Sequence, residues 1–202
     1  MEIWKSIVDG IANTTAAEWI AVGCGISYLI FVTLKKMICW LFAFSGASLY
    51  VYICITNNLY MESFLQFFYI ITAIYGWYNW RNNRKKAELI IQKWPLKNHF
   101  INLLISGLIT LVMGYIFHTY TDQSYPYLDA TTTVFSLSTT FLVIYRVLSN
   151  WVYWVIIDLL GMYLFLLKGL HLTSLLLLAY SIIAIFGYIK WQKDFKKQTT
   201  IV

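Results

Sequence analysis

The segment 150–165, NWVYWVIIDLLGMYLF, combines aromatic side chains with a carboxylate. Trp151, Trp154 and Asp158 are spaced at i, i+3 and i+7, which places them on one face of a helix. An indole face attracts a flat or cationic ring, and a carboxylate can balance a positive charge or accept hydrogen bonds. Trp151 could instead be an interfacial tryptophan, and Asp158 could join two helices. We favour binding, because an ionisable residue deep in an apolar span usually serves function.

Four polar residues in two other apolar segments could complete such a site. Gln66 and Tyr69 lie three residues apart, and a buried amide such as that of Gln66 must find a partner on another helix or on a ligand. Thr173 begins the last apolar segment, where it could also cap the helix, and Tyr180 follows seven residues later. The seven candidates therefore predict a site for a polar molecule with an aromatic ring.

Motifs of catalysis and metal binding are missing from the sequence. It contains no G-x-x-x-x-G-K-[ST], no H-E-x-x-H and no G-x-S-x-G. The histidines His99, His118 and His171 flank apolar segments without the spacing of metal ligands. We therefore expect no catalytic residue, no metal and no cofactor.

Composition indicates which elements hold these residues. Of the 202 residues, 60% are hydrophobic and 12% are charged, whereas soluble domains average about 25% charged residues. A helix of about 20 apolar residues spans a bilayer. The sequence predicts seven such spans, at 16–34, 37–55, 59–80, 99–117, 127–149, 150–169 and 170–191.

The basic residues orient these spans. Thirteen of the fifteen Lys and Arg residues fall on one side of the predicted bundle, and only Lys5 and Lys168 fall on the other. By the positive-inside rule, the amino terminus faces outward and the carboxyl terminus faces the cytoplasm. The net charge of +6 is then expected to face anionic lipid headgroups and not nucleic acid.

Two parts of the sequence resemble each other at a separation of 111 residues. YIITAIYGWYNW at 69–80 corresponds to YSIIAIFGYIKW at 180–191, and Lys35 corresponds to Arg146. Trp40 likewise corresponds to Trp151, and Glu18 to Asp129. Aromatic-rich helices produce chance matches, but chance does not explain why charges at the ends of the spans align as well. We interpret the pattern as an internal repeat.

The repeat predicts an all-α membrane protein with two parallel three-helix bundles joined by a linker helix, a 3+1+3 arrangement like that of SWEET transporters. Two such bundles could enclose a cavity and open it alternately to either side. The expected parts are an extracytoplasmic segment 1–15, a first repeat 16–80, a basic cytoplasmic loop 81–98, a linker span 99–117, a second repeat 127–191 and a cytoplasmic tail 192–202.

Three stretches resemble the PnuC family of bacterial nicotinamide riboside transporters: Y-G-W-Y-x-W at 75–80, YPYLDATTT at 125–133 and N-W-x-x-W-x-x-x-D at 150–158. The resemblance covers nearly the whole chain. It implies that Trp154 and Asp158 contact nicotinamide riboside, with Gln66 and the tyrosines of the third and seventh spans completing the site. It also implies a homotrimer in the bacterial cytoplasmic membrane, and facilitated diffusion driven by cytosolic phosphorylation of the substrate.

Other functions remain open at this point. Related PnuT and PnuX branches resemble thiamine and riboflavin transporters, so another vitamin is an alternative substrate. A membrane-embedded enzyme would need a partnered catalytic group near the membrane surface, and the sequence contains no such constellation. An assembly protein would not need Asp158 and Gln66 deep in the spans.

Overall fold

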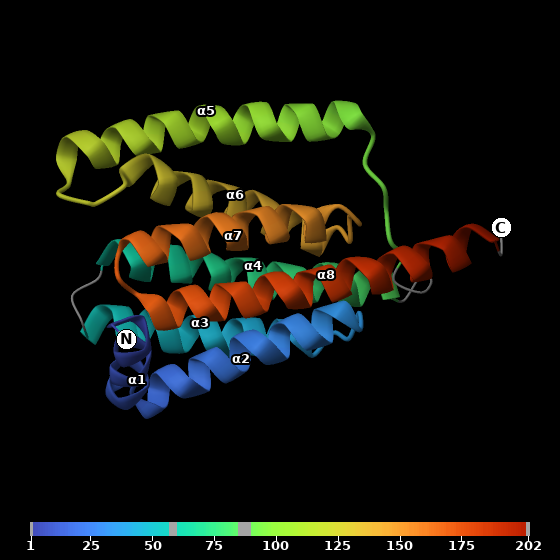
Figure 1. The fold of residues 1–202 in the computed structure, drawn as a ribbon. Helices are drawn as coiled ribbons and strands as arrows, with labels where there is room; N and C mark the ends of the chain where they lie inside the picture. Colours follow the sequence, from blue (N-terminus) through green and yellow to red (C-terminus); the bar gives the residue numbers. More distant parts are fainter. Residues whose placement is uncertain (1, 57–59, 85–89, 201–202) are drawn as a thin grey trace. The chain divides into compact units, whose positions relative to one another are not determined.

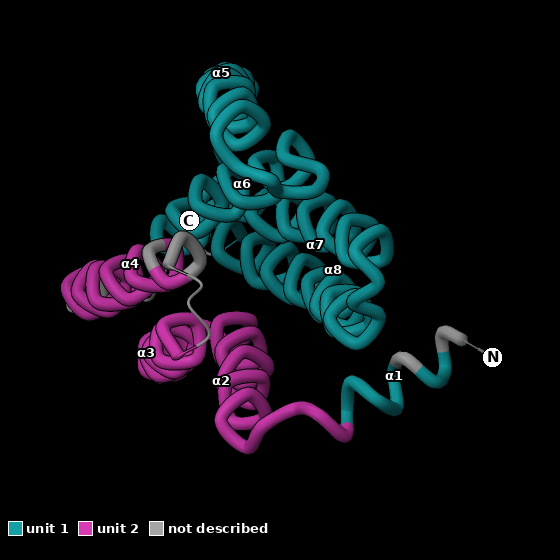
Figure 2. Tube along the Cα trace, turned by 90° about the vertical axis from the view of Figure 1, so that its left-hand side faces the viewer, with its two compact units in different colours: residues 1–11, 91–202 teal, residues 12–90 magenta. Residues whose placement is uncertain are grey.

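The computed structural model is built from α-helices, and it describes residues 2–56, 60–84 and 90–200. The helices are α1 (Glu2–Asn13), α2 (Ala16–Thr33), α3 (Cys39–Thr56), α4 (Tyr60–Arg84), α5 (Leu96–Tyr120), α6 (Pro126–Ile144), α7 (Asn150–Leu167) and α8 (His171–Thr200) (Figure 1). The chain divides into two compact units. Unit 1 comprises residues 1–11 and 91–202, and unit 2 comprises residues 12–90 (Figure 2).

Six helices in the described part of the chain are long and apolar enough to cross a membrane, namely α2, α3, α5, α6, α7 and α8. Helix α4 has 25 residues, which is also sufficient in length, but it is more polar and carries Gln66, Asn79 and Arg81. Helix α1 has only 12 residues, too few to span a bilayer. The prediction of an all-helical membrane protein is therefore confirmed.

In unit 2, α2 packs against α3 and α3 packs against α4. Trp40 on α3 is 2% exposed and meets Trp80 on α4 edge to face, with ring centroids 5.4 Å apart and an interplanar angle of 89°. The indole of Trp40 also lies against Gly76, where a Cβ atom would come within 2.5 Å of the ring. Gly76 is thus required for the close packing of α3 on α4.

Unit 1 contains the same arrangement, with α6 packed against α7 and α7 against α8. Trp151 on α7 is 1% exposed and meets Trp191 on α8 with centroids 5.3 Å apart, again at 89°. A Cβ atom on Gly187 would lie 2.6 Å from the Trp151 ring. Since each of these residues lies 111 positions after its counterpart in unit 2, the packing supports the repeat inferred from sequence.

The turn between the first two helices of each repeat is also the same. Lys35 and Arg146 both adopt left-handed backbone conformations, with φ of 53° and 56°. Their amides donate to Val32 O and Val143 O, respectively, at 2.9 Å in both cases. This turn closes α2 and α6 and starts the return of the chain through α3 and α7.

The turn in unit 1 has an additional cover. Gln92 N donates to Arg146 O at 2.9 Å, and Leu148 N donates to Gln92 O at 2.8 Å. Ile91 is 1% exposed, and its amide donates to the Gln198 side chain on α8 at 3.2 Å. Arg146 is buried, and this burial lowers the pKa of its guanidinium. The segment before α5 therefore ties this turn to α8.

Several helix ends differ from the sequence-based boundaries. Helix α8 continues through Thr200 and α5 begins at Leu96, so parts of the expected loop 81–98 and tail 192–202 are helical. Residues 145–149, assigned to a span by sequence, form the turn before α7. Residues 57–59 and 85–89, which include Lys85 and Lys86 of the predicted basic loop, lie outside the described residues.

An ion pair joins the start of α6 to the end of α7. Lys168 Nζ lies 2.6 Å from Asp129 Oδ2, and the Gln123 side chain donates to the same carboxylate oxygen. Lys168 is one of the two basic residues on the side predicted to face outward. Its charge is balanced locally by the Asp129 carboxylate.

Candidate functional site

Trp154 and Asp158 lie one turn apart on α7. Trp154 is half-buried, and Asp158 is 6% exposed. Within the described residues, neither side chain has a hydrogen bond, ion pair or aromatic contact. A buried carboxylate without a partner is costly, as is an amide or hydroxyl in the same position. Both side chains could therefore contact a ligand without first losing such a contact within the described residues.

The register of α7 on α8 indicates what Asp158 faces. A Cβ atom on Gly161 would lie 3.0 Å from Leu177, and the Trp151 ring lies against Gly187. The two helices are thus antiparallel. Asp158 lies between these contacts on α7, so it lies opposite the stretch of α8 from Leu177 to Gly187, which contains half-buried Tyr180. Asp158 and Tyr180 are therefore at matching levels of the α7–α8 pair.

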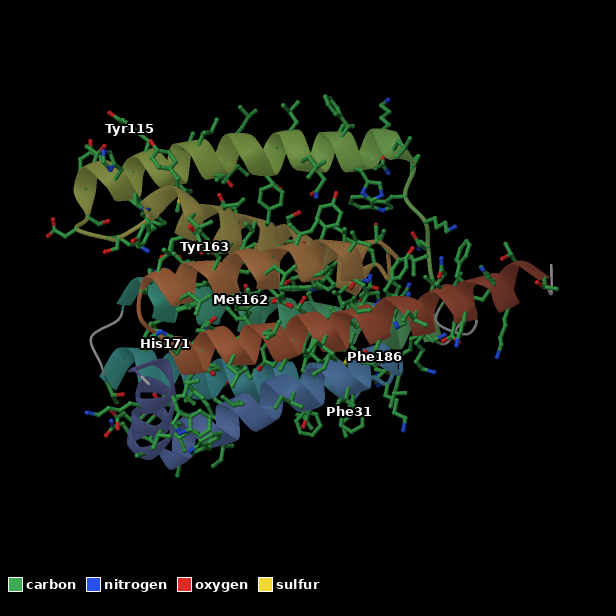
Figure 3. All side chains as sticks on the ribbon, viewed as in Figure 1. Phe31, Tyr115, Met162, Tyr163, His171 and Phe186 are labelled. Carbon is green, nitrogen blue, oxygen red and sulfur yellow. The ribbon has the colours of Figure 1, made fainter. Side chains whose placement is uncertain are left out.

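Thr173 lies near the start of α8 and is half-buried. Its neighbour Ser174 makes the structural contact instead, because the Ser174 hydroxyl donates to Met162 O at 3.0 Å. Figure 3 labels Met162 on α7 and His171 at the start of α8. No capping hydrogen bond involves the Thr173 side chain among the described residues, which leaves this hydroxyl available to a ligand.

Trp151 has a different environment from Trp154. Its indole is enclosed by Trp191 and Gly187, and it is almost fully buried. Among the described residues, the Trp151 Nε1 atom has no hydrogen-bond partner, and the same is true of its repeat counterpart, Trp40 Nε1. The indole face of Trp151 is occupied by α8, so its observed contacts are those of helix packing.

Gln66 and Tyr69 lie on α4 in unit 2, separate from the other five predicted site residues. Both side chains are half-buried. Thr72 Oγ1 donates to the Tyr69 backbone carbonyl at 3.0 Å, whereas the Gln66 amide makes no hydrogen bond within the described residues. Gln66 thus resembles Asp158, because each is a polar side chain within a long helix that has no hydrogen-bond partner among the described residues.

Thr139 and Asn150 are buried polar residues that were not identified as site candidates from sequence. Thr139 on α6 and Asn150 at the start of α7 are each 0% exposed, and neither Thr139 Oγ1 nor Asn150 Oδ1 has a hydrogen-bond partner in the described part of the chain. Asn150 does donate from Nδ2 to Val147 O at 2.7 Å. Threonine and asparagine are common near helix turns, so their types alone gave no signal.

Together, these side chains can bind a polar ligand and offer little for covalent chemistry. A half-buried indole, a buried carboxylate, a phenol and a hydroxyl suit a ring with a positive charge and several hydroxyls. Within the described residues, no group of three His, Cys, Asp or Glu side chains is placed to hold a metal ion. These side chains are therefore candidates for a binding site.

Comparison with known protein families gives one match that covers most of the chain. The family described as "Nicotinamide mononucleotide transporter" matches residues 15–193.

Curated relatives and one solved structure agree with this match. The nicotinamide riboside transporter PnuC of Escherichia coli strain K12 is 27% identical over 203 residues, covering 86% of this chain and 85% of that protein. The protein of the same name from Neisseria mucosa is 26% identical over 198 residues, covering 89% and 73%. The crystal structure of the vitamin B3 transporter PnuC superposes with a TM-score of 0.73 at 24% identity, covering 98% of this chain and 89% of that one. The fold is therefore the same.

Proposed function

Since the chain belongs to the nicotinamide mononucleotide transporter family, we propose that it carries nicotinamide riboside across the membrane. Its family and fold are those of a transporter and not of an enzyme. The relatives from Escherichia coli and Neisseria mucosa carry the name of nicotinamide riboside transporters, which supports this choice of substrate. The observation that carries the proposal is the unpartnered pair Trp154 and Asp158 on α7.

The chemistry of this pair suits nicotinamide riboside, which is a cationic aromatic ring attached to a sugar. The face of the Trp154 indole attracts the pyridinium ring, a contact worth about 0.5–2 kcal/mol depending on desolvation. Asp158, one turn away on the same helix face, balances the positive charge or accepts hydrogen bonds from the ribose hydroxyls. Tyr180 and Thr173 on α8 supply further polar contacts.

As the family resemblance implies, Gln66 and Tyr69 on α4 are two further proposed substrate contacts. The unpaired Gln66 amide offers both a donor and an acceptor to the polar edge of the substrate. Trp151 acts indirectly in this proposal, because its contacts with Trp191 and Gly187 fix α7 against α8 and so position Trp154.

The proposed site favours the riboside over the mononucleotide. Between Asn150 and Ile189, the only Lys or Arg is Lys168, which is already paired with Asp129 at the end of α7. A phosphate dianion would be buried beside Asp158 without a cation, at a large desolvation cost. The name of the family mentions the mononucleotide, but the side chains here favour the uncharged sugar end of the riboside.

The proposed mechanism is facilitated diffusion by alternating access. The proposed architecture is a SWEET-like 3+1+3 arrangement of seven spans, with α4 as the seventh, in which α5 joins two parallel three-helix bundles. The amino terminus faces outward and the carboxyl terminus faces the cytoplasm of a bacterium, across its cytoplasmic membrane. Cytosolic phosphorylation traps the substrate. Three copies form a homotrimer.

Binding by the purified protein tests the proposed site. Calorimetry in detergent compares wild type with Trp154→Ala and Asp158→Asn, and we expect each variant to lose about tenfold or more in affinity, which is about 1.4 kcal/mol. Trp19→Ala and Asp122→Asn change the same residue types at exposed positions and should bind like wild type. Undiminished affinity in both site variants would exclude this site.

The choice of substrate needs a separate comparison. Thiamine is the second candidate, because it is also a cationic aromatic molecule that the Trp154–Asp158 pair suits; riboflavin lacks the positive charge. Uptake into proteoliposomes is measured for all three and for nicotinamide mononucleotide. We expect nicotinamide riboside to be carried fastest. The assignment would be contradicted if thiamine were carried faster than the riboside, or if the mononucleotide were carried as fast as the riboside.

A further inference from the structure

Helix α1 has two chemically distinct faces. Trp4, Val8 and Ile11 follow the i, i+4, i+7 spacing of one helix face, and they are 71%, 46% and 46% exposed. Lys5 and Asp9 lie on the adjacent side of the helix and are exposed as well. The helix thus exposes the three apolar side chains Trp4, Val8 and Ile11 beside a charged face.

The edge of α1 next to the apolar face packs against the start of α8. Gly10 approaches Leu172 so closely that a Cβ atom on Gly10 would lie 3.3 Å from the Leu172 Cβ. Ile7, on the same edge, is half-buried. Because α8 is a membrane span that begins at His171, this contact holds α1 at the depth where α8 leaves the membrane.

The connection to α2 fixes the same depth independently. Only Thr14 and Thr15 separate α1 from α2, which is also a membrane span. Thr15 caps α2, accepting from the Glu18 amide at 3.3 Å while the Glu18 side chain accepts from the Thr15 amide at 2.6 Å. This capping box defines the first turn of α2. Because α2 begins at the membrane surface, the end of α1 that precedes it lies at the membrane surface as well.

We propose that α1 is an interfacial helix that binds the lipid surface through Trp4, Val8 and Ile11. Its charged face, with Lys5 and Asp9, points to water, and its apolar face lies among headgroups and the upper acyl chains. Tryptophan is favoured at this level of a bilayer. Two flanking spans bring the helix to the bilayer, which is why lipid and not a soluble protein is the partner.

The lipid contact has a consequence for α8. Leu172, the residue that α1 touches, directly precedes Thr173. A helix anchored in the lipid surface therefore restrains the end of α8 that carries Thr173. The inference depends on the membrane fold and not on which substrate is carried.

Spin labels in lipid nanodiscs test the orientation of α1. The three cysteines, Cys24, Cys39 and Cys54, are first replaced by alanine. Single labels are then attached in the variants Trp4→Cys, Val8→Cys, Ile11→Cys, Lys5→Cys and Asp9→Cys, and their relaxation by oxygen and by a water-soluble nickel chelate is measured. We expect the ratio of oxygen to nickel accessibility to be about threefold or more higher on the apolar face than at Lys5 and Asp9.

Each outcome of the accessibility measurement either supports or overturns the proposal. Labels on both faces that are equally accessible to the nickel chelate would place α1 in water and overturn it. Labels at Trp4, Val8 and Ile11 that neither reagent reaches would show a protein covering this face, a second copy or another partner, and would also overturn it. Each face is sampled at two or more positions, so the comparison survives the loss of one variant. The measurement needs no substrate, and so its failure is distinguishable from failure of the proposed transport.

Discussion

The two repeats have nearly the same scaffold but different side chains in their middle helices. Trp40, Gly76 and Trp80 in unit 2 match Trp151, Gly187 and Trp191 in unit 1, with closely similar ring geometry. In contrast, the positions in α3 that correspond to Trp154 and Asp158 are Ala43 and Ala47. The residues that both repeats share pack the helices together, whereas the residues found in only one repeat are candidates for binding.

This difference separates two tryptophans that look alike in sequence. Trp151 has a tryptophan counterpart and is buried against α8, whereas Trp154 has an alanine counterpart and no aromatic contact in the described part of the chain. Gln66 follows the same rule, because its counterpart is Leu177. Asymmetry between the repeats thus points to the residues of the proposed site, apart from Tyr69 and Tyr180, which are tyrosines in both copies.

The largest expected effect concerns the shared packing. A Cβ atom at Gly76 or Gly187 would come within 2.5 Å and 2.6 Å, respectively, of a tryptophan ring. We expect Gly76→Ala and Gly187→Ala each to lower the free energy of unfolding by about 1–3 kcal/mol, because a rigid indole must move. Thermal unfolding in detergent measures both variants, and the two losses should be similar if the repeats share one packing device.

Gly23 on α2 is the matched control for this pair. It is helical, and nothing lies within 4 Å of the position of its Cβ. Gly23→Ala should therefore leave stability unchanged or raise it by about 0.5–1 kcal/mol, since alanine favours the helix. A loss at Gly23 as large as at Gly76 would show that the method reports helix changes in general and not the tryptophan contact.

Effects of opposite sign are expected at Asp158 and Ala47. Both positions are 6% exposed. Asp158→Ala removes a buried carboxylate that has no partner, so stability should stay the same or rise while riboside affinity falls. Ala47→Asp places such a group in the other repeat and should lower the free energy of unfolding by about 1–3 kcal/mol. Calorimetry and thermal unfolding give the two readouts.

The outcome at Asp158 distinguishes binding from structure. If the Asp158 carboxylate has a structural role, Asp158→Ala should lower the free energy of unfolding by about as much as Ala47→Asp does. If Asp158 serves binding, Asp158→Ala should lower the affinity for the riboside without lowering the free energy of unfolding.

Sequence predicted much of this fold because apolar length and charge placement are directly visible in it. The ends of the spans 16–34 and 37–55 lie within two residues of the ends of α2 and α3. The helical character of 192–200 was missed, because this part of α8 is polar and lies beyond the apolar stretch. Helix α1 was described only as a segment, since 12 residues are too few for a span and amphipathic helices need their own test.

The candidate site was less predictable than the fold. The i, i+3, i+7 spacing of Trp151, Trp154 and Asp158 gives a common face, but it does not say which side chains are already occupied. Only the contacts of Trp151 with Trp191 and Gly187 reveal its environment. Gln66 and Asp158 were identifiable because an amide and a carboxylate deep in apolar spans are unusual in any packing.

The smallest expected effect compares the two turns that share a left-handed residue. Lys35 is half-buried, whereas Arg146 is 5% exposed and its carbonyl accepts from Gln92 N at 2.9 Å. A left-handed conformation costs a non-glycine residue about 1–2 kcal/mol, and glycine removes this cost at the expense of chain entropy. Lys35→Gly should therefore raise the free energy of unfolding by up to about 1 kcal/mol.

Arg146→Gly should have the opposite sign despite its equal backbone geometry. Glycine relieves the same backbone strain at Arg146, where φ is 56°. However, a large buried side chain is lost from a turn that is covered by Ile91 and by the Gln198 side chain of α8. We expect a loss of about 1 kcal/mol or more. Chemical unfolding of both variants measures the pair, with Lys36→Gly, at an exposed turn residue outside the left-handed region, as the control. Equal gains at Lys35 and Arg146 would mean that the turns are energetically equivalent, and that the cover over the second turn contributes nothing to its stability.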